Sequence, residues 1–375
     1  MKTRILLLIL MFASSFLLAQ NDSIIVQEWA ATYSSQDSIY NAATAIDVNG
    51  NIYVTGFTYS SVSQSDITTL KYDASGNLLW AKDYNGTGNN RDQATGICFD
   101  NAGNVYVTGY TSNASNNNDY VTIKYSATGT QLWAAIYDNG SHDIPRAIKS
   151  DVSGNIYVTG ESTGTNGRDY ATVKYDQNGN ELWVKRFDNG SNDYASAMAL
   201  DNSGNIYVTG RSYVFDFEYV TIKYLPDGTQ DWQATYGSLS HGNDWATAIA
   251  LDNNNNIYVT GFSLDNLNDG DMITVKYSSS GVQLWDKVFD DNNSNGKARS
   301  ITVDNIGGVY IAGDIKATNS TIISTIKYND QSGDIIWQQN HYMTGIVETT
   351  ASKITTDGNN GIYIAASTGT NSNLD

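Results

Sequence analysis

A ten-residue phrase that recurs along most of the chain limits what it can fold into more than any other feature. The phrase is Asp-x-x-Gly-Asn-Ile-Tyr-Val-Thr-Gly, with looser copies toward the C-terminus. Its tyrosines are separated by 53, 51, 50, 51, 52 and 53 residues. Such regular spacing indicates a tandem repeat of one supersecondary unit. The seven tyrosines are Tyr53, Tyr106, Tyr157, Tyr207, Tyr258, Tyr310 and Tyr363.

Each repeat of about 51 residues contains four short runs that are typical of β-strands. In the repeat around Tyr207 these runs are residues 195–200, 206–210, 218–224 and 230–236, termed strands a, b, c and d. They are rich in Val, Ile, Thr and aromatic residues, and clusters of Gly, Asn and Asp separate them. No window shows sustained helical periodicity. The pattern predicts an all-β fold, a seven-bladed β-propeller of four-stranded antiparallel blades.

The strands at which the chain enters and leaves the repeat predict how the two ends of the chain meet. Residues 28–33 resemble the d strand at 132–137, so the chain enters the repeat at strand d. The d-strand tryptophan occurs seven times, whereas the c-strand pair Lys-Tyr occurs six times. We expect an N-terminal outer strand that contains Trp29 to close the propeller in the sheet of residues 362–364. We also expect the last blade to lack its c strand, with Asp375 not the natural end.

The first nineteen residues have the pattern of a secretory signal peptide. Lys2 and Arg4 precede an apolar run that ends at Ala19 before Gln20. This run is shorter than the roughly 20 residues that a membrane-spanning helix needs. We therefore predict a signal peptide at 1–19, a single β-propeller domain at 20–375, and a secreted or cell-surface location.

Charge and cysteine content narrow the choice of partners. The net charge is −18, and removal of Lys2 and Arg4 would make it −20. Because such a chain repels phosphate groups, nucleic acid and anionic membrane are poor partners, and we expect no membrane insertion. The single cysteine, Cys98, excludes an intramolecular disulfide. We expect a monomer that binds an unknown protein or glycan.

Acidic residues recur in register where a binding site is most expected. Turns a–b and c–d fall at one end of each blade, and loops b–c and d–a at the other. We expect the second kind to be longer and more variable, and binding usually uses variable loops on a rigid scaffold. At this b–c/d–a end, acids stand at the mouth of strand a and at the start of strand c. They are Asp92, Asp143, Asp193 and Asp244, and Asp66, Asp119, Asp169, Glu218 and Asp271.

Two interpretations of these acids stay open. Carboxylates in a ring can hold Ca²⁺, which takes six to eight oxygen ligands. Alternatively, each acid caps its own loop by accepting hydrogen bonds from backbone amides. We favour the second, because a residue repeated in every blade more often has a structural role. We expect no cofactor, with Ca²⁺ as the open possibility.

The repeated motifs resemble those of a known family. Asn-[IV]-Tyr-Val-Thr-Gly, Tyr-[VA]-Thr-[IV]-Lys-Tyr and Gly-x-x-Leu-Trp recur over residues 28–375. They are similar to the SBBP repeat, the seven-bladed β-propeller repeat of bacterial secreted and surface proteins. The resemblance implies a fold and a location, and it implies no reaction.

The sequence supports three functional hypotheses. The first is a non-catalytic extracellular scaffold or binding module that uses the b–c/d–a face, since no Ser/His/Asp nucleophile motif is present. The second is a carbohydrate-binding or carbohydrate-cleaving propeller, for which loop aromatics such as Tyr213, Phe215 and Phe217 could stack on sugar rings. The third is a quinoprotein-like enzyme, although the sequence has no cluster of residues that could bind such a cofactor. We expect the protein not to be an enzyme.

Overall fold

The computed structural model describes most of the repeat region. The described residues are 9–12, 39–47, 49–59, 64–87, 89–237, 242–264, 270–290, 295–317, 320–341, 348–356 and 361–369. They form 27 β-strands and no helix. None of the described segments is a helix long and apolar enough to cross a membrane.

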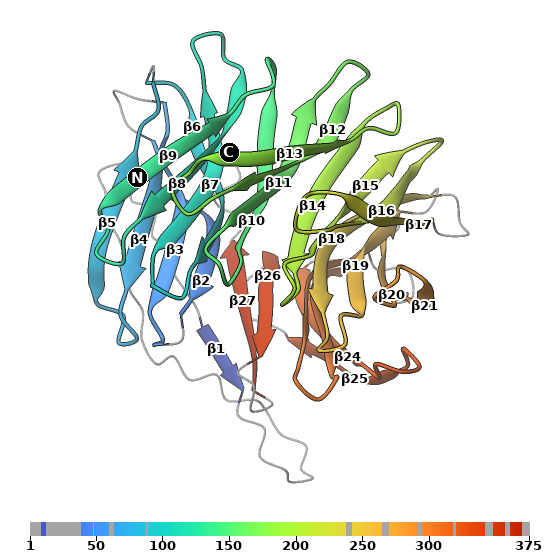
Figure 1. The fold of residues 1–375 in the computed structure, drawn as a ribbon. Helices are drawn as coiled ribbons and strands as arrows, with labels where there is room; N and C mark the ends of the chain where they lie inside the picture. The colour runs from blue at the N-terminus through green and yellow to red at the C-terminus, as the bar shows by residue number, and fades with distance from the viewer. Residues whose placement is uncertain are drawn as a thin grey trace. The chain divides into compact units, whose positions relative to one another are not determined.

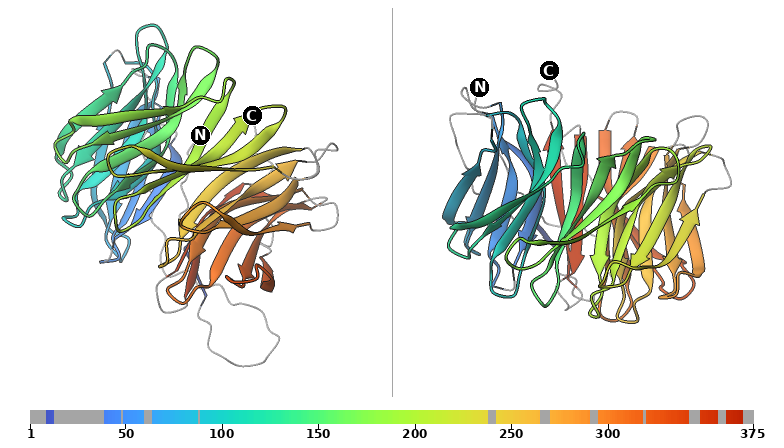
Figure 2. Two further views of the ribbon diagram at one scale, coloured as in Figure 1. Left: turned by 45° about the vertical axis from the view of Figure 1, so that its right-hand side comes forward. Right: turned by 45° about the horizontal axis from the view of Figure 1, so that its top comes forward.

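The strands group into seven antiparallel sheets, one for each repeat, and successive strands of a blade lie side by side (Figures 1 and 2). Blade 1 contains β2 (Ile39–Ile46), β3 (Ile52–Thr58), β4 (Asp66–Tyr72) and β5 (Leu78–Tyr84). Blade 2 contains β6 (Asp92–Phe99), β7 (Val105–Ser112), β8 (Asn118–Tyr125) and β9 (Gln131–Tyr137). Blade 3 contains β10 (Asp143–Ser150), β11 (Ile156–Thr163), β12 (Arg168–Tyr175) and β13 (Glu181–Phe187).

The later blades follow the same order of strands a to d. Blade 4 contains β14 (Asp193–Leu200), β15 (Ile206–Tyr213), β16 (Phe217–Tyr224) and β17 (Gln230–Tyr236). Blade 5 contains β18 (Asn243–Leu251), β19 (Ile257–Leu264), β20 (Gly270–Tyr277) and β21 (Gln283–Phe289). Blade 6 contains β22 (Asn295–Val303), β23 (Val309–Ala317), β24 (Ser320–Tyr328) and β25 (Ile335–His341). The prediction of an all-β, seven-bladed propeller is confirmed.

Blade 7 has three strands, as its missing c strand predicts. It contains β26 (Glu348–Thr356), β27 (Ile362–Gly369) and β1 (Ile9–Phe12). β1 pairs antiparallel with the outer edge of β27, where a c strand would lie (Figure 1). β1 falls within the predicted signal peptide, so cleavage after Ala19 would remove it. Trp29, which we expected in this blade, lies outside the described residues.

The chain divides into two compact units. The first holds blades 1 to 3 and strand β14, and the second holds blades 5 to 7. The division crosses blade 4 after Val208, Ile222 and Asp231. Within the first unit, one core cluster joins blades 1 and 2 and another joins blades 2 and 3. Two further clusters join blades 5 and 6, and blades 6 and 7, within the second unit.

The glycine that closes the repeated phrase permits a close approach of two strands. Gly160 on β11 faces β10, and a Cβ there would lie 2.2 Å from the carbonyl oxygen of Ile144. The register of β10 against β11 shifts at this place, between Pro145 and Ala147. Strand a shifts at the equivalent place in blades 1, 2, 5, 6 and 7. The glycine therefore marks a β-bulge that the repeat conserves within this chain.

Conserved side chains of one blade bind the next blade at its c–d turn. The Nε1 atom of Trp133 and the Nζ atom of Lys124 donate to the carbonyl oxygen of Gln177, at 3.1 and 2.9 Å. Lys124 also lies 5.1 Å from the centroid of the Tyr106 ring. The lysines of blades 1, 2, 3 and 5 donate to such a turn carbonyl, whereas Lys223 of blade 4 forms an ion pair of 2.9 Å with Asp231.

The two kinds of connection do not differ in length as we expected. In blade 2 the b–c loop covers 113–117 and the a–b turn covers 100–104, so each has five residues. In blade 3 the b–c loop, 164–167, is shorter than its a–b turn, 151–155. Much of the expected loop is strand, because the pairing of β11 with β12 continues to Thr163 and Arg168. The b–c connections of blades 2 to 4, 113–117, 164–167 and 214–216, differ in both sequence and length.

Candidate functional site

The a–b turns form closed sets of hydrogen bonds. In blade 3, Oδ1 of Asp151 accepts from the backbone N–H groups of Ser153 and Asn155, at 2.9 and 2.8 Å. Its Oδ2 accepts from Asn155 Nδ2 at 2.7 Å and from the Tyr157 hydroxyl at 3.0 Å. Gly154 has φ of +80°, which favours glycine. These carboxylates are occupied by their own turns and offer no binding site.

The four acids at the mouth of strand a are buried. Asp92, Asp143, Asp193 and Asp244 are each at most 1% exposed. In three of them, Oδ2 accepts a backbone N–H of the preceding d–a loop: from Gly86 at 2.7 Å, from Asn139 at 2.8 Å and from Asn189 at 2.8 Å. One oxygen of each of these three therefore caps a loop, in agreement with the interpretation that we favoured.

The five acids at the start of strand c are in different environments. Asp119 and Asp169 are buried, whereas Asp66, Glu218 and Asp271 are partly exposed. Asp169 forms an ion pair of 2.5 Å with Arg186 on β13. Burial raises the pKa of Glu218, and the neighbouring Asp216 and Asp244 raise it further.

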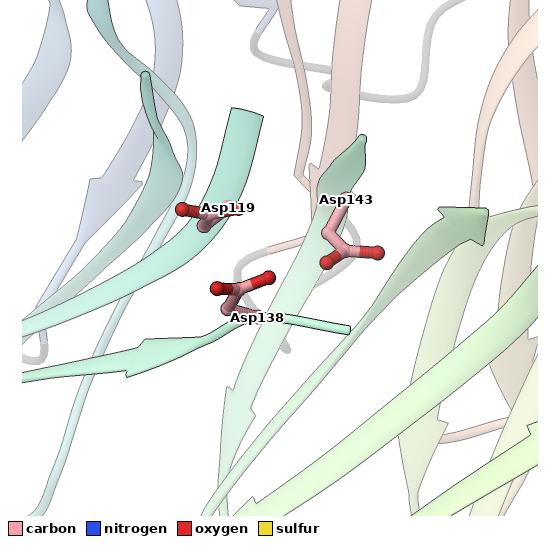
Figure 3. Close-up of side chains that lie close together, drawn as sticks. All are labelled: Asp119, Asp138 and Asp143. Carbon is pink, nitrogen blue, oxygen red and sulfur yellow. The ribbon is translucent and has the colours of Figure 1, made fainter. Parts of the chain in front are cut away.

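The structure groups these acids in a way that the sequence did not predict. Each cluster combines a c-strand acid, an a-strand acid of the next blade and an acid of the loop between the blades. One cluster is Asp119, Asp138 and Asp143 (Figure 3), and the other is Asp169, Asp188 and Asp193. Within each cluster, one oxygen of each carboxylate lies within 4.8 Å of the others.

Asp138 and Asp188 were missed by the sequence analysis. Both begin the same loop motif, Asp-Asn-Gly-Ser-x-Asp, which covers 138–143 and 188–193. The repetition of this hexapeptide could have identified both acids from the sequence. They were missed because they precede strand a and do not align with the acids at the strand starts. Oδ1 of Asp138 accepts from the N–H of Gly140 at 2.6 Å, and Oδ1 of Asp188 accepts from that of Gly190 at 2.7 Å.

Crowding of negative charge changes the acidity of this site. Burial, together with repulsion from Asp138 and Asp143, raises the pKa of Asp119 to about 6. Burial also raises the pKa of Asp143, against the lowering by hydrogen bonds from Ser162 and Asn139. For Asp169, burial raises the pKa and the bond from Arg186 opposes that change.

The b–c loop of blade 4 carries an exposed aromatic group. Phe215 is 92% exposed, and Tyr213 is 39% exposed. The Tyr213 and Phe217 rings meet edge to face at 5.2 Å between centroids. The Arg211 guanidinium lies 4.9 Å from the Phe217 centroid and 3.9 Å from that of Trp245. These contacts join Arg211 of β15 to aromatic rings of β16 and β18, while Phe215 extends into solvent.

A hollow of about 340 Å³ lies at the opposite, a–b/c–d end, between blades 3 and 4. Its lining includes Asp151, Asp201, Lys174 and Pro226. The groups that line it already have partners: Lys174 Nζ donates to the carbonyl oxygen of Pro226 at 2.9 Å, and both acids cap their turns. The hollow therefore offers few free polar groups to a ligand.

Fold and repeat together define the class: this is a β-propeller of seven blades. Residues 84–116 and 182–218 match the SBBP family model, described as a Beta-propeller repeat. The predicted resemblance to this repeat family is confirmed. No curated protein sequence matches the chain.

Solved structures of other propellers share the fold. The Dos1 propeller is similar with a TM-score of 0.55 and 10% identity, over 87% of this chain and 77% of that chain. The Neurospora crassa Pan2 WD40 domain has a TM-score of 0.52 and 10% identity, over 87% of this chain and 89% of that domain. At this identity the likeness shows the fold alone.

Proposed function

We propose that this protein is a non-catalytic extracellular binding scaffold that holds an unidentified protein or glycan at the b–c/d–a end of its blades. The contrast between the two ends carries the proposal. The a–b turns repeat one closed set of hydrogen bonds in blades 2 to 4. The b–c connections of the same blades, 113–117, 164–167 and 214–216, share neither sequence nor length. A varied surface on a rigid frame can be specific, whereas a uniform one offers little to distinguish partners.

The extracellular location is supported by the sequence alone. Residues 1–19 have the order of a signal peptide, and the net charge of −18 is unsuited to nucleic acid. Expression in a secreting host tests this directly. We expect the exported protein to begin at Gln20 on N-terminal sequencing, and an intact Met1 in the exported protein would contradict the proposal.

The absence of catalysis is supported by the environment of the acids. The buried acids Asp92, Asp143 and Asp193 each accept a loop N–H and recur in successive blades. A catalytic group is needed once in a molecule, whereas a capping group is needed in each repeat. The recurrence of these acids therefore favours a protein that binds its ligand and leaves it chemically unchanged.

A glycan is the ligand class that a specific observation favours. Phe215 is exposed on a loop whose neighbours Tyr213 and Phe217 are held in contact. Aromatic rings of this kind stack on the apolar faces of sugars. The proposal is therefore narrowed to carbohydrate binding through the b–c loop of blade 4.

The experiment measures binding to immobilised β-glucan, chitin oligosaccharides and mannan. We expect Phe215→Ala to weaken binding at least tenfold and Val152→Ala to leave it unchanged, because Val152 is 78% exposed in an a–b turn at the other end. Release of reducing ends from the same polysaccharides should stay at the level of the blank. Equal binding by both variants, or a loss confined to Val152→Ala, would place the ligand elsewhere.

A further inference from the structure

Blades 2 and 3 carry the same acidic cluster with different counter-charges. In blade 3, Asp169 is paired with Arg186, which also donates to the hydroxyls of Tyr137 and Ser162. Strand β9 is aligned with β13, and Ile136 occupies the position of Arg186. Ile136 is 48% exposed and carries no charge. Among the described residues no lysine or arginine forms an ion pair with Asp119, Asp138 or Asp143, and Arg186 acts on this cluster only through the effect of its charge on Asp143.

Two buried oxygens in the blade 2 cluster have no hydrogen-bond partner among the described residues. They are Oδ1 of Asp119 and Oδ1 of Asp143, whose residues are 5% and 0% exposed. The other oxygen of Asp119 has one long contact, 3.4 Å from Nδ2 of Asn113. Unpaired buried carboxylate oxygens are costly, because burial removes the water that would solvate them. Oδ1 of Asp169 in blade 3 is also without a partner, but its Oδ2 pairs with Arg186, so the blade 2 cluster differs in having no ion pair among the described residues.

The donor set is suited to a hard divalent cation. All three ligands are carboxylates, and one oxygen of each lies within 4.8 Å of the others. Ca²⁺ takes oxygen ligands at about 2.3–2.6 Å, so that two opposite ligand atoms are separated by roughly 5 Å. Figure 3 shows the three side chains converging from the start of β8, the end of β9 and the start of β10. Asp138 is exposed, which leaves an open side for entry and for water ligands.

We propose that Asp119, Asp138 and Asp143 bind a Ca²⁺-class divalent cation, and that Arg186 replaces this cation in the equivalent cluster of blade 3. The cation would bridge β8 of blade 2 to β10 of blade 3, as Arg186 bridges β13 to β11 and β12. The site lies at the b–c/d–a end, and it does not depend on the proposed carbohydrate binding.

The first test is thermal unfolding of the full chain in CaCl₂ and in NaCl at equal ionic strength, with calorimetric titration of Ca²⁺. Specific binding stabilises the folded state beyond the screening that Na⁺ provides. We expect Asp138→Asn to lower the Ca²⁺ affinity at least tenfold. The matched variant Asp188→Asn, at the equivalent exposed position of blade 3, should keep the affinity of the wild type. Identical unfolding in the two salts, or equal losses in both variants, would overturn the proposal.

A second variant separates cation binding from general damage. Ile136→Arg places a guanidinium where blade 3 has Arg186, on a half-exposed residue whose replacement leaves the core intact. We expect this variant to melt at a higher temperature than the wild type without Ca²⁺ and to lose the specific response to Ca²⁺. A wild-type response to Ca²⁺ in Ile136→Arg, with Asp138→Asn also unaffected, would show that the cluster binds no cation.

Discussion

The side chains of Lys124 and Trp133, on neighbouring strands of blade 2, donate to the same acceptor, the backbone carbonyl oxygen of Gln177 in blade 3. The relationship recurs at the carbonyl oxygens of Ala127, Pro226 and Asp330. One turn carbonyl thus receives two donors from the preceding blade, and this explains why the repeat keeps both a lysine and a tryptophan.

Removing one donor should weaken the contact between blades. Trp133→Phe retains most of the aromatic packing and loses the 3.1 Å hydrogen bond. We expect the free energy of unfolding to fall by about 1 kcal/mol, the usual net value of such a bond. Urea unfolding measures it, with Trp133→Phe and Lys124→Met alone and together. Because the two donors share an acceptor, the double variant should depart from additivity. Strict additivity would contradict a shared role.

In blades 2 to 6 the glycine of the c–d turn packs against the tryptophan of the preceding blade. Gly179 has φ of +85°, and a Cβ there would lie 2.8 Å from Cδ2 of Trp133. Gly190 has φ of +87°, and a Cβ there would meet nothing within 4 Å. We expect Gly190→Ala to cost about 1 kcal/mol from backbone conformation alone, and Gly179→Ala to cost about 2–4 kcal/mol because overpacking is added. Equal losses in urea unfolding would show that the ring moves aside freely.

The a–b turn acids should make the fold sensitive to acid. Burial acts to raise the pKa of Asp100, but hydrogen bonds from Asn104, Tyr106 and the Ala102 amide outweigh it, so the pKa is lowered. A lowered pKa in the folded state stabilises the protein above the ordinary pKa of about 3.9, and this stability is lost as pH falls through the folded value. We expect Asp100→Ala to lose about 1–2 kcal/mol at pH 7. Its difference from the wild type should shrink below about pH 4. A constant difference down to pH 2 would contradict this.

The strands and turns of the blades could be predicted from the sequence because the same turn and core residues recur in each repeat. Asp151, Gly154 and Tyr157 recur at fixed offsets, so turn, strand and buried tyrosine could be assigned together. The acids of strands a and c could also be placed at one end of the blades. Their grouping could not, because it depends on which strand of one blade faces which strand of the next. Asp138 joins Asp119 and Asp143 through contacts between blades, and no spacing along one repeat encodes them.

The sequence also could not show which of the two clusters has a positively charged partner. Arg186 and Ile136 occupy equivalent positions on exposed faces of d strands, where substitutions between repeats look unimportant. Only the ion pair between Arg186 and Asp169 shows that one of these positions carries the counter-charge of a buried acid.

The last prediction concerns the pH dependence that the blade 2 cluster confers without bound cation. Burial, followed by repulsion from Asp138 and Asp143, raises the pKa of Asp119 to about 6, while the Asn113 amide opposes the change. The Nδ1 atom of His142 accepts the N–H of Asn118, the residue that precedes Asp119. Because the folded state holds the Asp119 proton more tightly than the unfolded chain, this group stabilises the fold at low pH. That contribution is lost as pH rises from about 4 to about 6.

Asp119→Asn should abolish this loss. We expect the variant to be more stable than the wild type by about 1–3 kcal/mol at pH 7.5, and to differ little from it at pH 4. Ile136→Arg should reduce the same pH dependence by a different route, since a neighbouring guanidinium lowers the pKa of a carboxyl group, as Arg186 does for Asp169. Urea unfolding in a chelating buffer at pH 4, 5, 6 and 7.5 measures both variants against the wild type. Parallel curves for the wild type and Asp119→Asn across this range would show that another group titrates.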